Sequence, residues 1–392
     1  MAEVRAFRAI RYDERVAGPL SDLICPPYDV ISPEERARLA GWNERNFVRV
    51  ELPEEGPGGY AHAAELMHAW MHERALVADP PSVYLHEHHF TIGGTRATRR
   101  GVFVALRLHD PSEGVVLPHE RTFPKAKADR LELLRATRAN TSPIFGMIDG
   151  GPMKMLAEAS AAPLGEARLG DDRHVLSRVL DTQKVARFKD ALRKERVYIA
   201  DGHHRYETAL TYAAELGVGP DANERFVLTY LCGLDDPGLR ILATHRLVAG
   251  GRAALDAAIA RSFNTSVIDR GALEDIQPGI VLVRDGKFTR LEFRADADRS
   301  ALPPAWRELP VAIAEELLLR DVRQTDAVIT YEHDTDRAIG AATGEWSAIL
   351  LRAVDPMTLR AVADAGERLP QKTTYFYPKV PAGLVIRSLD LG

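Results

Sequence analysis

The chain has 392 residues, more than one hydrophobic core normally accommodates, so we expect two or three domains. The formal net charge is -5 with acidic and basic residues interspersed, which argues against a protein that coats nucleic acid. Only Cys25 and Cys232 occur, without metal-like spacing, so we expect neither a disulfide framework nor a structural zinc site.

The N-terminus lacks the apolar core of a signal peptide, and no stretch of about eighteen apolar residues occurs in the sequence. We therefore expect a cytoplasmic protein that does not enter a membrane. A proline-rich segment, residues 25–29, predicts an extended lead-in. Ser32-Pro33-Glu34-Glu35 resembles a capping box with proline at the first helical position, which predicts a helix running towards Ala40.

A second helix is predicted from about Tyr60 to Leu76, followed by a hairpin. The hairpin consists of the run VYLHEHHFTI, the turn GGT and the run GVFVALRL. His86 and His88 share a face of the first strand, and His89 follows them. We expect solvated surface histidines here rather than metal ligands, because no carboxylate-rich partner stands nearby at a matching spacing.

Cations and hydrogen-bonding side chains are concentrated in the segment HERTFPKAKADR, residues 119–130. Pro124 predicts that its first half is irregular and that a helix begins near Asp129. Lys125 and Lys127 could then act as mobile charges over phosphates, with Arg130 as a planar clamp. The alternative is a solvated basic loop with salt bridges along the following helix.

The pentapeptide DGHHR, residues 201–205, lies between the apolar run VYIA and a segment of helical periodicity. We expect a strand to end there and a helix to begin, with Tyr206, Leu210, Ala213 and Ala214 on its buried face. The first amides of such a helix lack intrahelical partners and carry partial positive charge. They therefore favour a bound phosphate or carboxylate.

The side chains of this turn suit the same chemistry. Gly202 lets the backbone approach an anion, and Arg205 is suited to bidentate phosphate contact. His203 and His204 titrate near neutrality, and Asp201 adds a carboxylate. The alternative is that Asp201 only caps the helix while the histidines are surface or packing residues.

After residue 250 the pattern changes to a helix, a hairpin marked by Asp285-Gly286, and a further helix, VAIAEELLLRDV. We predict a catalytic region at residues 1–250 and an appended α+β domain at residues 251–392. Near the end, residues 371–379 form a strand-like aromatic run with two lysines, for which a core strand and a functional segment stay equally open.

Five segments identify the chain as resembling the prokaryotic family called domain of unknown function 1015. They are CPPYDVIS from Cys25, HERTFPKAKADRLELLRATRANTSPIF from His119, ADGHHRYETAL from Ala200, ATHRLV from Ala243 and KTTYFYPKVPAGL from Lys372. The DGHHR turn is also similar to the Asp-Gly-His-Thr-Arg turn of free serine kinases and to the Gly-x-x-Arg turn of the ParB and sulfiredoxin-like superfamily.

This second resemblance implies an α/β fold, mixed with α+β, in which a ParB/sulfiredoxin-like nucleotide-binding core carries the C-terminal segment. Members of that superfamily bind nucleotides at this turn. His204 replaces the threonine of the serine kinases, which changes the expected substrate contacts. The catalytic cysteine of sulfiredoxin is absent, and no helix-turn-helix segment of the ParB type is evident.

The resulting hypothesis is a phosphotransferase that uses ATP or ADP with Mg²⁺ to phosphorylate a small hydroxylated metabolite. Free L-serine is the leading acceptor, giving O-phosphoserine. A metal-dependent phosphoester hydrolase and a non-catalytic nucleotide-binding regulator of the ParB type are the alternatives. We expect nucleotide and small-molecule ligands, neither nucleic acid nor membrane as partners, and leave a homo-oligomer open.

Each role has assigned residues. The catalytic candidates are Glu120, Asp201, His203 and His204. Nucleotide phosphates are assigned to Gly202, Arg205, Lys125, Lys127, Arg130 and Thr122. Substrate contacts are assigned to His119, Asp29 and Lys372, and magnesium to Asp201. The choice between Glu120 and His204 as general base depends on an environment that the sequence does not reveal.

Overall fold

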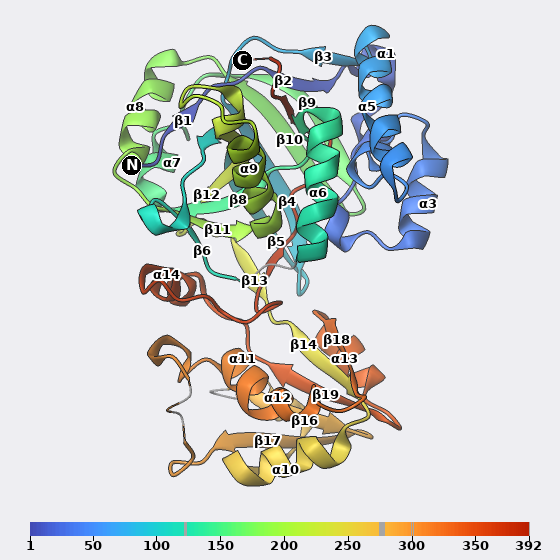
Figure 1. Ribbon diagram of the computed structural model, residues 1–392, viewed down its shortest axis with the longest axis vertical. Coiled ribbons are helices and arrows are strands. Elements are labelled where there is room, and N and C mark those ends of the chain that lie inside the picture. Colours follow the sequence, from blue (N-terminus) through green and yellow to red (C-terminus); the bar gives the residue numbers. More distant parts are fainter. Residues whose placement is uncertain (121–123, 274–278, 299, 301, 392) are drawn as a thin grey trace. The chain divides into compact units, whose positions relative to one another are not determined.

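The protein, seen in a computed structural model, is a mixed α/β chain (Figure 1). The structure describes residues 1–120, 124–273, 279–298, 300 and 302–391. The chain forms two compact units, the first comprising Met1–Pro118, Thr122–Leu239 and Pro378–Gly392, and the second His119–Arg121 and Arg240–Tyr377. The mixed α/β class is confirmed, while the ParB/sulfiredoxin-like assignment and the catalytic nature of residues 1–250 stay predictions.

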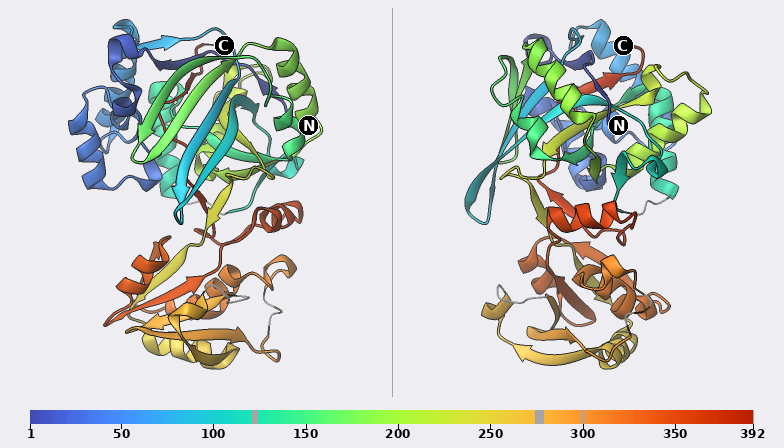
Figure 2. Two further views of the ribbon diagram at one scale, coloured as in Figure 1. Left: turned by 180° about the vertical axis from the view of Figure 1, so that it is seen from behind. Right: turned by 90° about the vertical axis from the view of Figure 1, so that its left-hand side faces the viewer.

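A large mixed sheet dominates the first unit. In spatial order its strands are β6 (Val116–Pro118), β11 (Val197–Asp201), β8 (Ile144–Ile148), β12 (Phe226–Gly233), β5 (Thr95–Arg107), β4 (Tyr84–Ile92), β10 (Asp172–Val179) and β9 (Ala161–Leu169), and β1 (Val4–Arg5) pairs with β5. The β6–β11 and β8–β12 pairs are parallel, and the other neighbours are antiparallel. The left view of Figure 2 shows the sheet from behind, with β9, β10 and β4 towards the viewer.

The second, smaller sheet of this unit joins the two ends of the chain. Its order is β3 (Leu76–Ala78), β2 (Ala9–Tyr12), β21 (Ile386–Ser388) and β7 (Ala139–Asn140). The helices of the unit are α1 (Glu14–Ala17), α2 (Leu20–Leu23), α3 (Pro33–Trp42), α4 (Val48–Glu51), α5 (Pro57–His72), α6 (Pro124–Thr137), α7 (Gly150–Lys154), α8 (Thr182–Leu192) and α9 (His203–Glu215). In the described part of the chain, none of the helices combines the length and apolarity needed to cross a bilayer.

The main core of the first unit lies where α8 and α9 pack on one face of the large sheet (Figure 1). Phe188 of α8 and Tyr206 of α9 are both almost fully buried there, against valines and leucines of β5 and β12. The buried face of α9 contains Tyr206 and Ala213 as predicted, and also Ala209 and Tyr212, whereas Ala214 is exposed. Burial of this apolar surface fixes α9 on the sheet.

The second unit contains a six-stranded sheet and a short two-stranded one. The larger sheet has the order β15 (Phe263–Ile268), β17 (Lys287–Phe293), β16 (Ile280–Arg284), β19 (Trp346–Leu351), β14 (His245–Ala249) and β18 (Val328–Glu332), and β13 (Arg240–Leu242) pairs with β20 (Tyr375–Tyr377). The helices are α10 (Arg252–Ser262), α11 (Pro310–Ile313), α12 (Leu319–Val322), α13 (Thr335–Ala341) and α14 (Pro356–Asp364), with a π-helical turn at Ala314–Leu318.

Most elements with a strong local pattern are present. The two predicted hairpins form β4–β5 and β16–β17, and the capping-box helix is α3, in which the Ser32 hydroxyl accepts the Glu35 amide. The prediction of an irregular segment after Pro124 is wrong, because α6 begins at Pro124 itself. Proline suits the first helical position, where its missing N–H costs no hydrogen bond.

The expectation of solvated histidines in β4 is wrong for His86 and His88, which are each 1% exposed. Nε2 of His86 lies 3.1 Å from Nδ1 of His174, and Nε2 of His88 lies 2.8 Å from a carboxylate oxygen of Asp172. Only His89, on the opposite face of the strand, is partly exposed. The histidines of this face therefore belong to a buried polar cluster.

Gly101 of β5 allows close packing against Tyr230, because the ring of Tyr230 occupies the space where a side chain at position 101 would stand. A Cβ atom at Gly101 would lie 2.1 Å from Cζ of Tyr230, which is itself fully buried. Gly101→Ala should therefore lower the free energy of unfolding by about 1–3 kcal/mol, the usual cost of overpacking. Urea titration measures this.

Gly151→Ala is the matched control, since among the described residues no atom lies within 4 Å of its Cβ position. Equal stability of the two variants would contradict the packing of Tyr230 against Gly101.

Candidate functional site

The DGHHR turn has the predicted local structure. Strand β11 ends at Asp201, and α9 starts at His203 after Gly202, whose φ of 86° is in the left-handed region. A Cβ at position 202 would come within 3.1 Å of the Arg205 guanidinium. Glycine is therefore required twice here, for its backbone conformation and for the close approach of Arg205.

Asp201 lies at the centre of a buried group of ion pairs. Its Oδ2 is 2.7 Å from Nη2 of Arg205, and its Oδ1 accepts a hydrogen bond from Nζ of Lys379. Burial by itself would raise the pKa of Asp201, but the charges of Lys379 and Arg205 outweigh it and hold the pKa well below its ordinary value. The carboxylate is thus ionised and neutralised by two cations.

Arg205 is tied into the structure on a second side, because its Nη1 donates to the carbonyl of Pro143. Burial acts to lower its pKa, but the carboxylates of Asp201 and Asp29 raise it, so the guanidinium stays charged. Its Nε has no hydrogen-bond partner among the residues that the structure describes. In this conformation Arg205 is engaged by protein groups, and an incoming anion would have to join or replace these contacts.

Arg130 of α6 approaches the same cluster and is 5% exposed. Its guanidinium stacks over the ring of Tyr28, 4.1 Å from the ring centroid, and its Nη1 donates to the Glu51 carbonyl at 2.7 Å. Nε of Arg130 lies 2.7 Å from Oδ2 of Asp129. The predicted clamp residue is therefore held in a fixed orientation by aromatic and hydrogen-bonding contacts.

Ser142 and Glu51 close the cluster between Arg130 and Pro143. The Ser142 hydroxyl donates to Oε1 of Glu51 at 2.7 Å, and the side chain of Glu51 is fully buried. Its second oxygen has no hydrogen-bond partner in the described part of the chain. A buried carboxylate without a full set of partners is costly, which marks this position as a place for a bound water or ligand group.

Four of the five segments that carry the family resemblance, called hallmark segments from here on, meet at this cluster. Tyr28 belongs to the first, Arg130 and Pro143 to the second, Arg205 to the third and Lys379 to the last. Lys379 and Asp201 are 178 positions apart in the sequence. The segments that identify the family thus share one location in the first unit, whereas the ATHRLV segment lies in the second unit.

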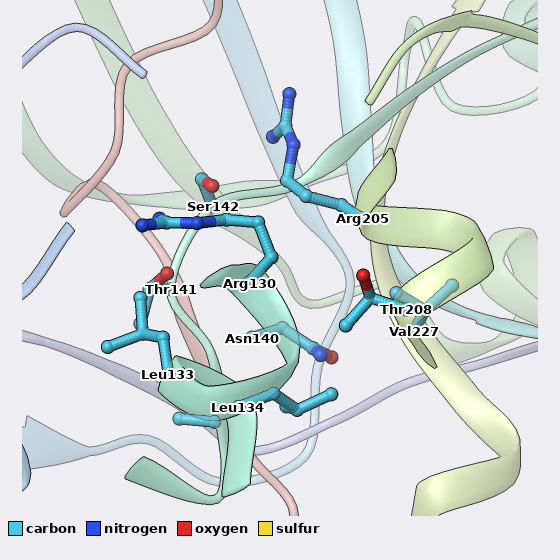
Figure 3. Close-up of a pocket in the computed structure, with 10 residues that line it drawn as sticks. Arg130, Leu133, Leu134, Asn140, Thr141, Ser142, Arg205, Thr208 and Val227 are labelled. Carbon is cyan, nitrogen blue, oxygen red and sulfur yellow. The ribbon is translucent and has the colours of Figure 1, made fainter. Parts of the chain in front are cut away.

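A small cavity of 40 Å³ lies beside the cluster, between α6, α9 and the segment that follows β7 (Figure 3). It is lined by Arg130, Leu133, Leu134, Ala139, Asn140, Thr141, Ser142, Arg205, Thr208 and Val227. A water needs about 10–15 Å³ of such volume, so the space suits a few waters or one small anion. A complete nucleotide requires a larger opening than this one.

The remaining predicted residues are distributed over both units. In the first unit, Nζ of Lys127 pairs with Glu207 of α9 at 3.0 Å, His203 is buried and Asp29 is exposed. Lys125 is part of α6, but its side chain and the whole of Thr122 lie outside the described residues.

In the second unit, the structure brings together three residues from two distant hallmark segments. Oε1 of Glu120 accepts the Lys372 amide at 3.0 Å, and Nε2 of the buried His119 lies 3.1 Å from Oγ1 of Thr374. Glu120 and Lys372 are 252 positions apart in the sequence. His119 and Lys372, the predicted substrate contacts of this unit, therefore lie next to Glu120, one of the two candidates for the general base.

Sequence reasoning did not assign a role to Tyr28, Glu51, Ser142 or Lys379. Tyr28, Ser142 and Lys379 lie inside hallmark segments, and this position in the sequence could have indicated a role at the site. Glu51 lies in the ordinary-looking run NFVRVELP, which carries no such signal.

In the described ranges no three His, Cys, Asp or Glu side chains come together in a metal-binding arrangement. Both oxygens of Asp201 already contact cations, Nη2 of Arg205 and Nζ of Lys379, so Mg²⁺ at this carboxylate would lie next to two positive charges. Asp201 as a magnesium ligand stays a prediction.

Comparison with known proteins confirms the family resemblance. The model of the family described as "Protein of unknown function (DUF1015)" matches residues 4–312. None of the curated proteins matches the chain.

Several solved structures are similar to parts of the fold. A conserved hypothetical protein from Pyrococcus furiosus is 13% identical over 74% of this chain and 97% of its own, with a TM-score of 0.41. A free serine kinase in complex with AMP is 14% identical over 74% and 93%, with a TM-score of 0.41. SbnI with a C-terminal truncation, from Staphylococcus aureus, is 11% identical over 73% and 87%, with a TM-score of 0.42. Similarity at this level carries no argument about what the chain binds.

Proposed function

This chain belongs to the DUF1015 family, and we propose that the α9 turn of its first unit is the phosphate-binding part of a nucleotide-dependent phosphotransferase. The observation that carries the proposal is the meeting of four hallmark segments around one buried cluster of cations and carboxylates. Segments so far apart in sequence have no need of a common polar centre for folding alone, since an apolar core is less costly.

The cluster supplies what phosphoryl transfer asks of a protein. The reaction needs fixed positive charge around the transferred phosphoryl group more than it needs covalent chemistry. Arg205, Lys379 and Arg130 are held by carboxylates and an aromatic ring, so their charges are already oriented when a phosphate arrives. Gly202 adds the start of α9, whose partial positive charge acts in the same direction.

Asp201 takes a positioning role in this proposal. Because it is ionised and pairs with Arg205 and Lys379, it keeps two cations charged and side by side in a buried environment. Binding of a phosphate would exchange part of these ion pairs for contacts to phosphate oxygens, at Arg205 first because its Nε has no hydrogen-bond partner among the described residues. The bound anion then replaces a carboxylate as the counter-ion of the same guanidinium.

The leading reaction is the phosphorylation of free L-serine with ATP or ADP as donor. The serine hydroxyl oxygen forms a bond to the terminal phosphorus, the bond from that phosphorus to the bridging oxygen breaks, and the hydroxyl proton passes to a base. Glu120 and His204 remain the two candidates for this base. Mg²⁺, when bound, would neutralise phosphate charge between donor and protein.

The purified full-length chain, supplied with Mg²⁺, L-serine and either ATP or ADP, is expected to produce O-phosphoserine. Mass spectrometry of the products measures this directly. L-alanine is the matched control because it lacks only the hydroxyl, and it should give no phosphorylated product. Nucleotide binding without transfer to serine or related alcohols would contradict the kinase and favour a regulatory protein, while release of phosphate from phosphoesters would favour a hydrolase.

A further inference from the structure

A second, larger cavity lies in the first unit near the end of β8. Its volume is 540 Å³, within the range of about 300–1,000 Å³ typical of small-molecule sites. Residues of β4, β5, α7 and the turn after β12 line it, among them Leu85, Glu87, Arg100, Met153, Lys154 and Asp236. The proposed phosphotransferase function makes no use of this cavity.

The register of the sheet separates this cavity from the α9 turn. Asp201 pairs with Phe145 near the start of β8, whereas Gly150, which lines the cavity, follows the end of the strand at Ile148. From Phe145 to Ile148 the strand advances by about 10 Å at about 3.3 Å per residue, and Gly150 follows beyond the end of the strand. The cavity is therefore a separate site.

One wall of the cavity is apolar and well fixed. Leu156 is fully buried and belongs to the main core of the unit. Leu85 and Met153 pack against the same core while also lining the cavity. An apolar part of a ligand would thus be held against a wall that is anchored by the packing of α7 and β4.

Three carboxylates and two cations line the rest of the cavity, and two of the carboxylates are already paired. Oε1 of Glu87 lies 3.0 Å from Nε of Arg100, and Oδ2 of Asp235 lies 3.1 Å from Nζ of Lys154. Both pairs are well exposed, so each is worth little in stability. Their charges cancel, which leaves the third carboxylate, Asp236, to set the charge preference of the site.

Asp236 is oriented by backbone groups rather than by a cation. Its Oδ1 accepts the Gly238 amide at 2.8 Å, and its Oδ2 accepts the Arg100 amide at 3.2 Å. Among the residues that the structure describes, no side-chain cation lies within 4.0 Å of this carboxylate. Burial raises the pKa of Asp236 against the opposing effect of its backbone hydrogen bonds and of the charges of Arg99 and Arg100, and a bound ammonium group would stabilise the ionised carboxylate.

We infer that this cavity binds a small organic cation, a primary amine with an apolar body, whose ammonium group contacts Asp236 while its body lies on Leu85 and Met153. Each carboxylate oxygen keeps a second lone pair after accepting one backbone amide, so an ammonium donor can be accommodated. An anionic ligand is disfavoured, because it would face three carboxylates against two cations.

Three probes of equal chain length test the inference: hexylamine, hexanol and hexanoate. Calorimetric titration of the full-length chain should show that hexylamine binds at least tenfold more tightly than hexanol, and that hexanoate binds least. Asp236→Asn should abolish the preference of hexylamine over hexanol. Asp171→Asn, which removes an exposed carboxylate from the turn between β9 and β10, is the matched control and should bind hexylamine like the wild type.

Ala157→Trp gives an independent result, because it fills the cavity without touching the hydrogen bonds of Asp236. This variant should lose binding of both hexylamine and hexanol while keeping the thermal stability of the wild type. Equal affinity for all three probes, or unchanged hexylamine binding in Ala157→Trp, would overturn the assignment. Neither outcome depends on whether the α9 turn transfers phosphate.

Discussion

Arg205→Ala is expected to lower kcat/KM for phosphoryl transfer by at least about 100-fold, the usual effect of removing one donor that stabilises transition-state charge. Arg205 lies in the first turn of α9, and its guanidinium is fixed by Asp201 and the Pro143 carbonyl. Its loss removes the planar pair of donors that a phosphate needs. Initial rates of O-phosphoserine formation at varied nucleotide concentrations measure the effect.

A purely structural role for Arg205 would give a different result. Removing one partner of a buried ion pair costs about 3–5 kcal/mol in stability, so Arg205→Ala will also lower Tm. Arg205→Lys keeps the charge next to Asp201 but loses the planar fork, so it should fold like the wild type and still lose most activity. Arg38→Ala, at an exposed ion pair of α3, is the matched control and should change neither quantity.

An Arg205→Lys variant with wild-type kcat and wild-type nucleotide affinity would contradict the phosphate-binding role and leave Arg205 as a brace for the turn. A variant that loses kcat at full stability would support it. Measuring Tm and nucleotide Kd on the same samples separates these outcomes.

The α9 turn was predictable because its causes are local. An apolar run, a glycine and a 3.6-residue period are all read from about fifteen consecutive residues, and the strand and helix follow from them. The ion pairs of the turn were not predictable in the same way. Lys379 reaches Asp201 only because the end of the chain returns to the first unit, which no local pattern reveals.

The histidines of β4 show a different limit. Alternation predicts that His86 and His88 share a face, but it does not say which face is buried. Tyr84 and Phe90 have the same parity as these histidines and are also buried, so the aromatic residues at both ends of the strand were the available signal. Their partners from β10 could not be foreseen, because the pairing of β4 with β10 joins segments about 90 residues apart.

This buried cluster leads to the second large effect: lowering the pH from 7.5 to 5.5 should destabilise the first unit by about 4 kcal/mol. Burial is the main cause that holds the pKa of His86 and His174 well below the ordinary value and lowers the pKa of His88 to about 2. All three therefore stay neutral in the folded protein over this range, while in the unfolded chain each titrates near 6.5.

The sign follows from proton binding. Below about pH 6.5 the unfolded state binds more protons than the folded state, so stability falls as the pH falls. Each histidine that stays neutral in the folded state lowers the free energy of unfolding by about 1.4 kcal/mol between pH 7.5 and 5.5. Three such histidines give the expected total of about 4 kcal/mol. Asp172 acts in the opposite direction, because burial raises its pKa and the folded state therefore binds its proton more readily than the unfolded state.

Urea unfolding at pH 7.5, 6.5 and 5.5, monitored with a probe in the first unit, measures how the free energy of unfolding changes with pH. In the part of the chain that the structure describes, Arg99 and Asp172 are charged groups that contact the ring of His88, and neither gains a proton in the unfolded chain within this interval. His174→Gln should reduce the pH-dependent loss by about one third, because one of three titrating groups is removed. His68→Gln, at an exposed position of α5, is the matched control and should leave the slope unchanged. Stability that stays constant between pH 7.5 and 5.5 would show that these histidines are not held neutral by burial.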